Sequence, residues 1–239
     1  MPFRLKRIQA RQAAKACTVQ DPALLNESVS LQNDLRNDLT ILKNFDGTPR
    51  KVAYKQERID HYLPWVLGLI EGDQGHEDRI LSYMLVWTID IGDIRRFLKI
   101  AAYMQKHDLK PPFETKLPSF ISDNARDNMD SLSIEDAEAI ALFIADQDVQ
   151  ENSHASFLRL LGEKILSGRE PTSISNDDLS DVERVIGYWE TAVQLDSNVG
   201  IKKKLEQLQK RVVELKTANE MTANQDASNT TESAQNTND

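Results

Sequence analysis

The sequence predicts an all-α fold of stacked helical hairpins that ends in a disordered acidic C-terminal tail. Three observations predict this fold class. Apolar residues recur at steps of three and four along most of the chain, which is the spacing of one helix face. Clusters of Gly, Pro, Asp and Asn interrupt these stretches and mark turns. Strand signals are nearly absent, since the short run 51–54 is too brief to form one.

Length and composition limit the possible classes of protein. The chain has 239 residues, 40% of them hydrophobic, which suffices for one or two helical domains with a core. Its net charge of -9 argues against a protein that coats DNA, so any nucleic-acid contact must be local. The single cysteine, Cys17, excludes an internal disulfide. No apolar run is long enough to cross a membrane and no signal core follows Met1, so we expect a cytoplasmic protein.

Four helices are predicted before the double proline at 111–112. That proline pair ends the last of them, because proline lacks an N–H donor and restricts the residue before it. Turn residues at 46–49 and 72–75 separate the earlier helices. The four helices cover 24–45, 57–71, 80–91 and 94–104.

A second group of helices follows a predicted loop over 112–132. Capping residues mark three helix starts: Ser133 with Asp136, Ser153, and Ser180 with Glu183. Gly168 is a natural stop for the helix that Ser153 would begin. The tail 218–239 is polar and acidic, and it lacks the apolar surface needed to offset the entropy of ordering.

The last predicted helix, 199–217, carries an apolar seam. Its steps of four, three, four and three are typical of a coiled coil, but two heptads are too few to establish one. The helix pairs 77–90 with 93–108 and 180–195 with 199–216 look like tetratricopeptide-type hairpins, although no period of about 34 residues recurs. The seam consists of Ile201, Leu205, Leu208, Val212 and Leu215.

The tryptophans invite a stacking role on nucleic acid. Trp87 and Trp189 fall on the inner faces of amphipathic helices, where core packing is the better interpretation. Trp65 follows Pro64 at a predicted helix start, so a subunit contact is an alternative for it.

Two sets of acids are candidates for nuclease chemistry, which needs carboxylates converging on a cation such as Mg²⁺. Acids are also favoured at helix starts and caps, so a structural role is the alternative for both sets. Neither set has the lysine partner of a common nuclease signature, and no phosphate-binding glycine loop is present. We therefore expect no cofactor, with Mg²⁺ required only if the chain cuts DNA. The candidates are Asp90 and Asp93 beside Gly92, and Asp177, Asp178 and Asp181 before a helix.

Two basic zones are candidates for DNA contact. Residues 1–16 carry five basic side chains and no acid, and a second zone lies around 43–58. Such side chains can contact phosphates, which gives affinity without sequence choice, and a solvated charged face is the alternative. The four histidines are far apart and none shows metal-ligand spacing. The candidate DNA-binding residues are Arg4, Lys6, Arg7, Arg11, Lys15, Arg50, Lys51 and Lys55.

The stretch from His61 to Pro112 resembles the small terminase subunits of temperate tailed phages. It carries Leu63-Pro64-Trp65, then Met84-Leu85-Val86-Trp87, Asp90-Ile91-Gly92-Asp93-Ile94 and a Lys-Pro-Pro stop. The resemblance returns over 179–216, with Gln194-Leu195-Asp196 and a Lys-rich helix. The family is the GpM-type, usually labelled terminase endonuclease subunit.

This resemblance implies a role in packaging double-stranded viral DNA in the host cell cytoplasm. A small subunit recognises the cohesive-end site on concatemeric DNA and presents it to the terminase large subunit, which holds the ATPase. Such subunits commonly form homo-oligomeric rings. Because no nuclease signature is visible, we expect the large subunit to supply the catalytic carboxylates. The alternatives are a metal-dependent endonuclease in its own right and a helical-repeat scaffold without a DNA role.

The chain divides into five predicted segments along these lines. The division assigns the basic N-terminal helical region to DNA contact and the C-terminal helical hairpin to possible oligomerisation. The segments are 1–50 (basic region), 51–112 (core with the family motif), 113–175 (second helical group), 176–217 (C-terminal hairpin) and 218–239 (tail).

Overall fold

The computed structural model describes residues 22–235, with side chains described from 25 to 221. Within that range the protein is all helical, with nine α-helices, two short 3₁₀ segments and no strand. The predicted all-α fold is therefore confirmed. The chain forms two compact units that divide after Val149, and each is described by itself below.

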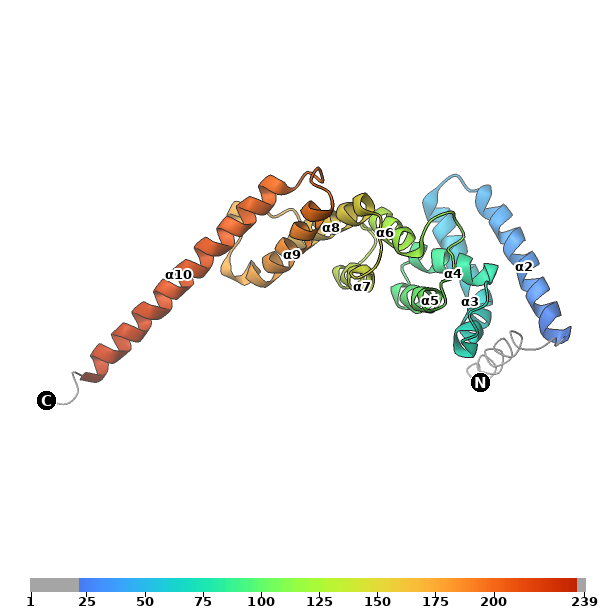
Figure 1. Ribbon diagram of the computed structural model, residues 1–239, viewed down its shortest axis with the longest axis horizontal. Coiled ribbons are helices and arrows are strands. Elements are labelled where there is room, and N and C mark those ends of the chain that lie inside the picture. Colours follow the sequence, from blue (N-terminus) through green and yellow to red (C-terminus); the bar gives the residue numbers. More distant parts are fainter. Residues whose placement is uncertain (1–21, 236–239) are drawn as a thin grey trace. The chain divides into compact units, whose positions relative to one another are not determined.

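The described part of the first unit, residues 22–149, contains six helices in chain order (Figure 1). Helix α4 packs against both α3 and α5, α2 packs on α3 and α4, and α6 pairs with α7. The helices are α2 (Pro22–Lys43), α3 (Thr48–Gly72), α4 (Arg79–Asp90), α5 (Ile94–Lys106), α6 (Leu117–Asp127) and α7 (Ile134–Ile144).

The core of the first unit lies between α3, α4 and α5. Tyr62 and Trp87 meet edge to face, with ring centroids 5.7 Å apart, and both are buried. Trp65 is only 6% exposed, and its indole N–H donates to the Asp78 carboxylate over 3.1 Å. Pro64 lies inside α3 and not at a helix start. Trp65 is therefore a core residue of this unit, and the alternative subunit contact is not favoured.

Helix α2 is fixed to α3 by a buried carboxylate. The apolar stripe of α2 includes Leu31, Leu35 and Leu42, and Asp38 lies within it at 4% exposure. Asp38 accepts hydrogen bonds from Tyr54 (2.7 Å), Arg58 (2.9 Å) and Tyr62 (2.6 Å), all on α3. A buried carboxylate is costly unless it is paired in this way.

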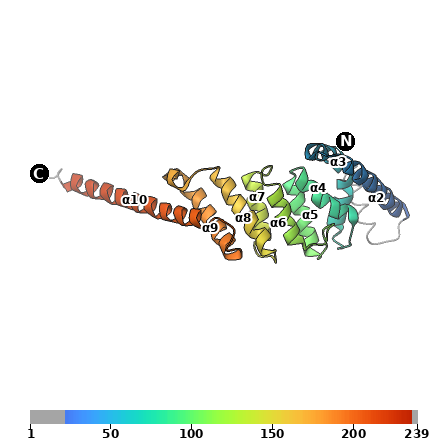
Figure 2. The ribbon, with the colours of Figure 1, turned by 90° about the horizontal axis from the view of Figure 1, so that it is seen from above.

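The second unit consists of α8 (Glu151–Leu166), η1 (Pro171–Ser173), η2 (Asn176–Asp178), α9 (Leu179–Leu195) and α10 (Lys202–Gln235). Helices α8 and α9 lie side by side at close range (Figure 2). A Cβ on Gly162 of α8 would fall 2.1 Å from Nε1 of Trp189 on α9, so only glycine fits there. Trp189 is fully buried, which confirms its predicted place in a core, as for Trp87.

Helix α10 packs on α9 through the seam predicted from the sequence. Ile201, Leu205, Leu208 and Val212 are all buried. This part of the seam therefore stabilises a hairpin within one chain. The helix continues to Gln235, into the segment whose composition predicts disorder.

Several local predictions were wrong. The expected loop 112–132 contains α6, whose short apolar face (Phe120, Ile121, Ala125) is set among polar residues. Ser153 is buried within α8, which begins at Glu151, and is not a cap. Ser180 lies inside α9, because the capping box is formed one turn earlier by Ser175 and Asp178. Ser133 does cap α7, as predicted.

Candidate nucleic-acid interface

The predicted DNA-contact residues fall into two groups. Those of the N-terminal zone lie outside the described residues, and the other three lie in the first two turns of α3. The first group comprises Arg4, Lys6, Arg7, Arg11 and Lys15, and the second comprises Arg50, Lys51 and Lys55.

The first turn of α3 presents two cations. Gly47 is its N-cap and makes no side-chain cap, and Pro49 supplies a helix-compatible φ at the start of the helix. Arg50 is exposed, Lys51 is partly exposed, and neither has an ion-pair partner among the described residues. Because the helix dipole is positive at this end, cations here are unfavourable unless an anion offsets them.

Lys55 has a different environment, because it points into the first unit. Its ammonium donates to the Asp90 carboxylate at the end of α4, and the two side chains are only 15% and 22% exposed. This pair fixes the start of α3 to the end of α4. The charge of Lys55 is therefore already paired within the fold, unlike the charges of Arg50 and Lys51.

Asp93, the other acid of the first candidate set, is the N-cap of α5. Its carboxylate accepts the backbone N–H of Arg96 over 3.1 Å and the guanidinium of the same residue over 2.5 Å. Asp90 and Asp93 thus have structural partners on either side of the turn that joins α4 and α5. Their geometry is that of an ion pair and a helix cap.

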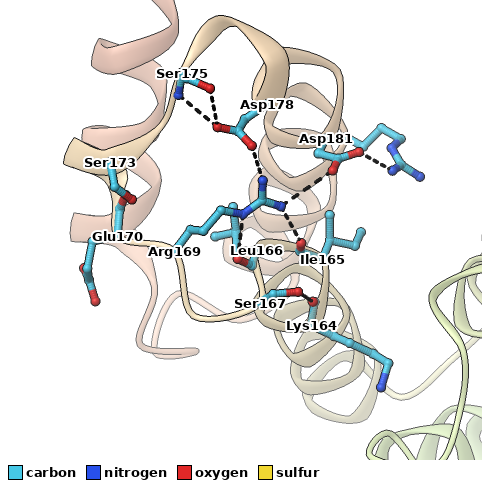
Figure 3. Close-up of polar contacts among 11 residues, drawn as sticks. Lys164, Ile165, Leu166, Ser167, Arg169, Glu170, Ser173, Ser175, Asp178 and Asp181 are labelled. Atoms are coloured by element: carbon cyan, nitrogen blue, oxygen red, sulfur yellow. Dashed lines mark hydrogen bonds and ion pairs between the residues drawn. The ribbon is translucent and has the colours of Figure 1, made fainter.

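Two acids of the second candidate set, Asp178 and Asp181, lie beside Arg169 in the second unit (Figure 3). The Asp178 carboxylate accepts the backbone N–H (2.9 Å) and hydroxyl (2.8 Å) of Ser175, and it pairs with Arg169. The Ser175 hydrogen bonds, assisted by the guanidinium, hold the pKa of Asp178 below its usual range. Asp181 pairs with Arg184 (2.7 Å) and lies 3.6 Å from Arg169. Asp177 is exposed.

These acids do not converge on a cation site. Across residues 25–221, whose side chains the structure describes, no group of three or more His, Cys, Asp or Glu side chains is placed to hold a metal ion. The same part of the chain has no helix long and apolar enough to cross a membrane.

The sequence reasoning missed the basic residues of α5. This helix has a buried face of Ile94, Phe97, Ile100, Ala101 and Met104. Four of its exposed positions carry Arg or Lys, and the helix contains no acid. The signal was available in the sequence, because an exposed helix face ordinarily mixes both signs of charge. The basic residues are Arg95, Arg96, Lys99 and Lys106.

The described residues thus form stacked helices with exposed cations, and most of the candidate acids are held in helix caps and ion pairs. The family model for the phage small terminase subunit matches residues 32–155, more than half of the chain. The chain therefore belongs to the phage small terminase subunit family, and its role lies in packaging phage DNA. The match spans almost all of the described first unit.

Two curated relatives agree with this family. The chain is 27% identical over 190 residues to the "Terminase, endonuclease subunit" of Escherichia phage P2, covering 74% of this chain and 71% of the relative. It is 24% identical over 193 residues to the "Probable terminase, endonuclease subunit" of Haemophilus phage HP1, covering 76% and 69%. No solved structure matches the chain.

Proposed function

We propose that this chain recognises the cohesive-end packaging site on concatemeric viral DNA and directs its cleavage and packaging with a large ATPase subunit. One observation carries the proposal beyond the family. In a chain of net charge -9, the start of α3 presents the exposed cation Arg50 beside the partly exposed Lys51. Local positive charge of this kind provides affinity for DNA phosphates.

Cleavage is the part of the proposal for which the relatives' names suggest an alternative. Both relatives are named endonuclease subunits, so cutting by the chain itself is the second candidate function. The partners of Asp90, Asp93, Asp178 and Asp181 support assigning the catalytic carboxylates and their Mg²⁺ to the large subunit. This chain would then specify where the cut falls.

A ring of several copies would strengthen DNA binding. Each copy repeats the same cations, so weak contacts add through their high effective concentration. We therefore propose a homo-oligomer acting in the host cell cytoplasm, where concatemeric viral DNA is packaged.

The test incubates the purified full chain with Mg²⁺ on DNA carrying the cohesive-end site and on a scrambled control. Both gel shift and cleavage are read, with and without the large subunit. If the chain recognises the site and leaves catalysis to the large subunit, it should shift the cohesive-end DNA in preference to the control without cutting it. Cutting should then appear only when the large subunit is added.

Site-specific cutting by the chain alone would support the endonuclease alternative. Asp90→Asn, Asp93→Asn and Asp181→Asn variants then separate the two functions, because purely structural carboxylates would leave cutting intact. Absence of any DNA shift under all conditions would contradict the proposal.

A further inference from the structure

We propose that the solvent-facing side of α5 binds the phosphate backbone of double-stranded DNA, so that α5 and the first turn of α3 form one binding surface. This inference rests on the proposed DNA-binding function and assigns it a location. It extends to α5 the sequence-based assignment, which placed DNA contact in residues 4–58.

The exposed side of α5 is a straight row. Arg95, Lys99, Ala102 and Lys106 are all exposed and follow at steps of four, three and four, which places them on one line along the helix. Arg96 lies beside this line at its start. At 1.5 Å per residue the row extends for about 16 Å.

The placement of these cations costs stability within the isolated chain. Arg95 and Arg96 lie in the first turn of α5, where the helix dipole opposes positive charge, and the N-cap acid Asp93 is paired with Arg96 and not with Arg95. Arg95 and Lys99 have no ion-pair partner among the residues that the structure describes. An anionic ligand would offset both the unfavourable helix dipole and the repulsion between these cations. Water alone offsets them only weakly.

The turn between α4 and α5 brings α3 and α5 to the same place. Lys55 of α3 bonds Asp90 at the end of α4, and Asp93 caps α5 three residues later. Lys51 lies one turn before Lys55, so the starts of α3 and α5 both lie near the end of α4. The two helices thus contribute Arg50, Lys51, Arg95, Arg96 and Lys99 to one end of the first unit.

Three acids close to these cations in the fold are already paired with basic side chains. Asp90 pairs with Lys55, Asp93 with Arg96, and Asp73 with Lys106 and His107. The hydrogen bonds from Lys106 and His107 hold the pKa of Asp73 below its usual range. These carboxylates therefore do not cancel the unpaired charges of Arg95 and Lys99.

The geometry favours a nucleic acid over an acidic protein. A duplex carries one phosphate charge per about 1.7 Å of its axis with both strands counted, so a stretch as long as the row carries roughly ten charges in all. A straight row of cations flanking the small Ala102 fits such a uniform polyanion. Phosphate contacts carry no sequence information, so we expect this surface to supply affinity and orientation, and other parts of the assembly to supply site choice.

The experiment measures DNA binding by the full chain as a function of salt, on cohesive-end and scrambled duplexes. Arg95→Gln with Lys99→Gln should weaken binding to both DNAs about tenfold and lower the slope of log affinity against log salt by about 2. The charge-preserving pair Arg95→Lys with Lys99→Arg should bind like the unaltered chain.

A matched control removes the same charge elsewhere. Lys202→Gln with Lys203→Gln changes two exposed cations of the second unit and should leave DNA binding unchanged. Thermal melting checks that each variant is folded. Lys99→Gln alone is a milder change and should lower the logarithm of the DNA affinity by about half as much as the double variant.

The outcomes separate this inference from the proposed function. If the unaltered chain binds DNA and the Arg95/Lys99 variant binds equally well, the assignment of DNA binding to α5 is wrong, whereas the proposed DNA-binding function stands. Loss of binding in an Arg4, Arg7, Arg11 and Lys15 variant would then place contact at the N-terminus. If the α5 variant loses only its association with the large subunit, the surface binds protein and the inference is overturned.

Discussion

The two units of this chain stabilise buried polar groups in different ways. In the first unit the Asp38 carboxylate is 4% exposed and accepts hydrogen bonds from two tyrosines and an arginine. In the second unit His154 is 7% exposed, and burial lowers its pKa below the usual 6.5. The first unit retains a polar group by surrounding it with donors, and the second keeps a titratable ring neutral. The contributions of Tyr54, which donates to Asp38, and of His154 to stability should therefore be lost at opposite ends of the pH range.

The largest expected effect is Asp38→Ala. It leaves two tyrosine hydroxyls and a guanidinium without their shared acceptor, and breaking a buried network of this kind costs about 3–5 kcal/mol. Hydrogen exchange should show faster opening of the first unit, with the second unit unchanged. Asp178→Ala, which removes a partly exposed cap, is the control and should loosen the second unit only. Equal effects of the two variants would contradict the role of burial.

The next largest effect is Gly162→Ala in the second unit. The added Cβ would overlap the Trp189 indole, and overpacking of this kind costs about 1–3 kcal/mol. The matched control is Gly187→Ala on α9, where nothing lies within 4 Å of the new Cβ. That control should be neutral or more stable by about 1 kcal/mol, because alanine favours helix. The free energies of unfolding of the two variants are compared by urea denaturation, with hydrogen exchange as the readout.

Alkaline pH should destabilise the first unit through Tyr54. Burial, together with the hydrogen bond to Asp38, raises the pKa of Tyr54 to about 12 from 10.0. The unfolded chain therefore loses this proton first, and stability present below pH 10 declines as pH rises towards 12. Tyr54→Phe should cost about 1 kcal/mol at neutral pH and flatten this decline. A decline of unchanged steepness would exclude Tyr54 as its source.

Acidic pH should produce the smallest effect, on the second unit. Because the pKa of His154 is lowered in the folded state, the unfolded chain binds its proton more readily. The stability contributed by neutral His154 is therefore lost progressively as pH falls below 6.5. Melting temperatures of the chain and of His154→Gln, compared between neutral and acidic pH, should converge on acidification.

Sequence patterns predicted the helices that have long, uninterrupted apolar stripes. Helices α2, α4, α5 and α9 lie close to their predicted positions because their buried residues recur at helical spacing. Helix α6 was missed because its apolar residues are few and polar Asp and Asn surround them. Ser180 was mistaken for a cap because Ser175 and Asp178 offer a competing capping box one turn earlier, and only the folded backbone decides between them.

The candidate site was predicted in part. The exposure of Arg50 could be expected from its place after a turn, whereas the burial of Lys55 depends on Asp90, which lies 35 residues away. The basic residues of α5 could have been found from the charge pattern along that helix. The position of α5 relative to α3, however, depends on how both helices pack on α4. Tertiary proximity of this kind does not follow from local spacing.

The contact between Gly162 and Trp189 has a consequence for how related chains diverge. Since the indole occupies the space of a Cβ at position 162, neither position can change alone without loss of packing. A larger residue at 162 is permissible only after the ring at 189 has been replaced by a smaller side chain. The two positions should therefore vary as a correlated pair, and a natural chain with alanine at the first should lack tryptophan at the second.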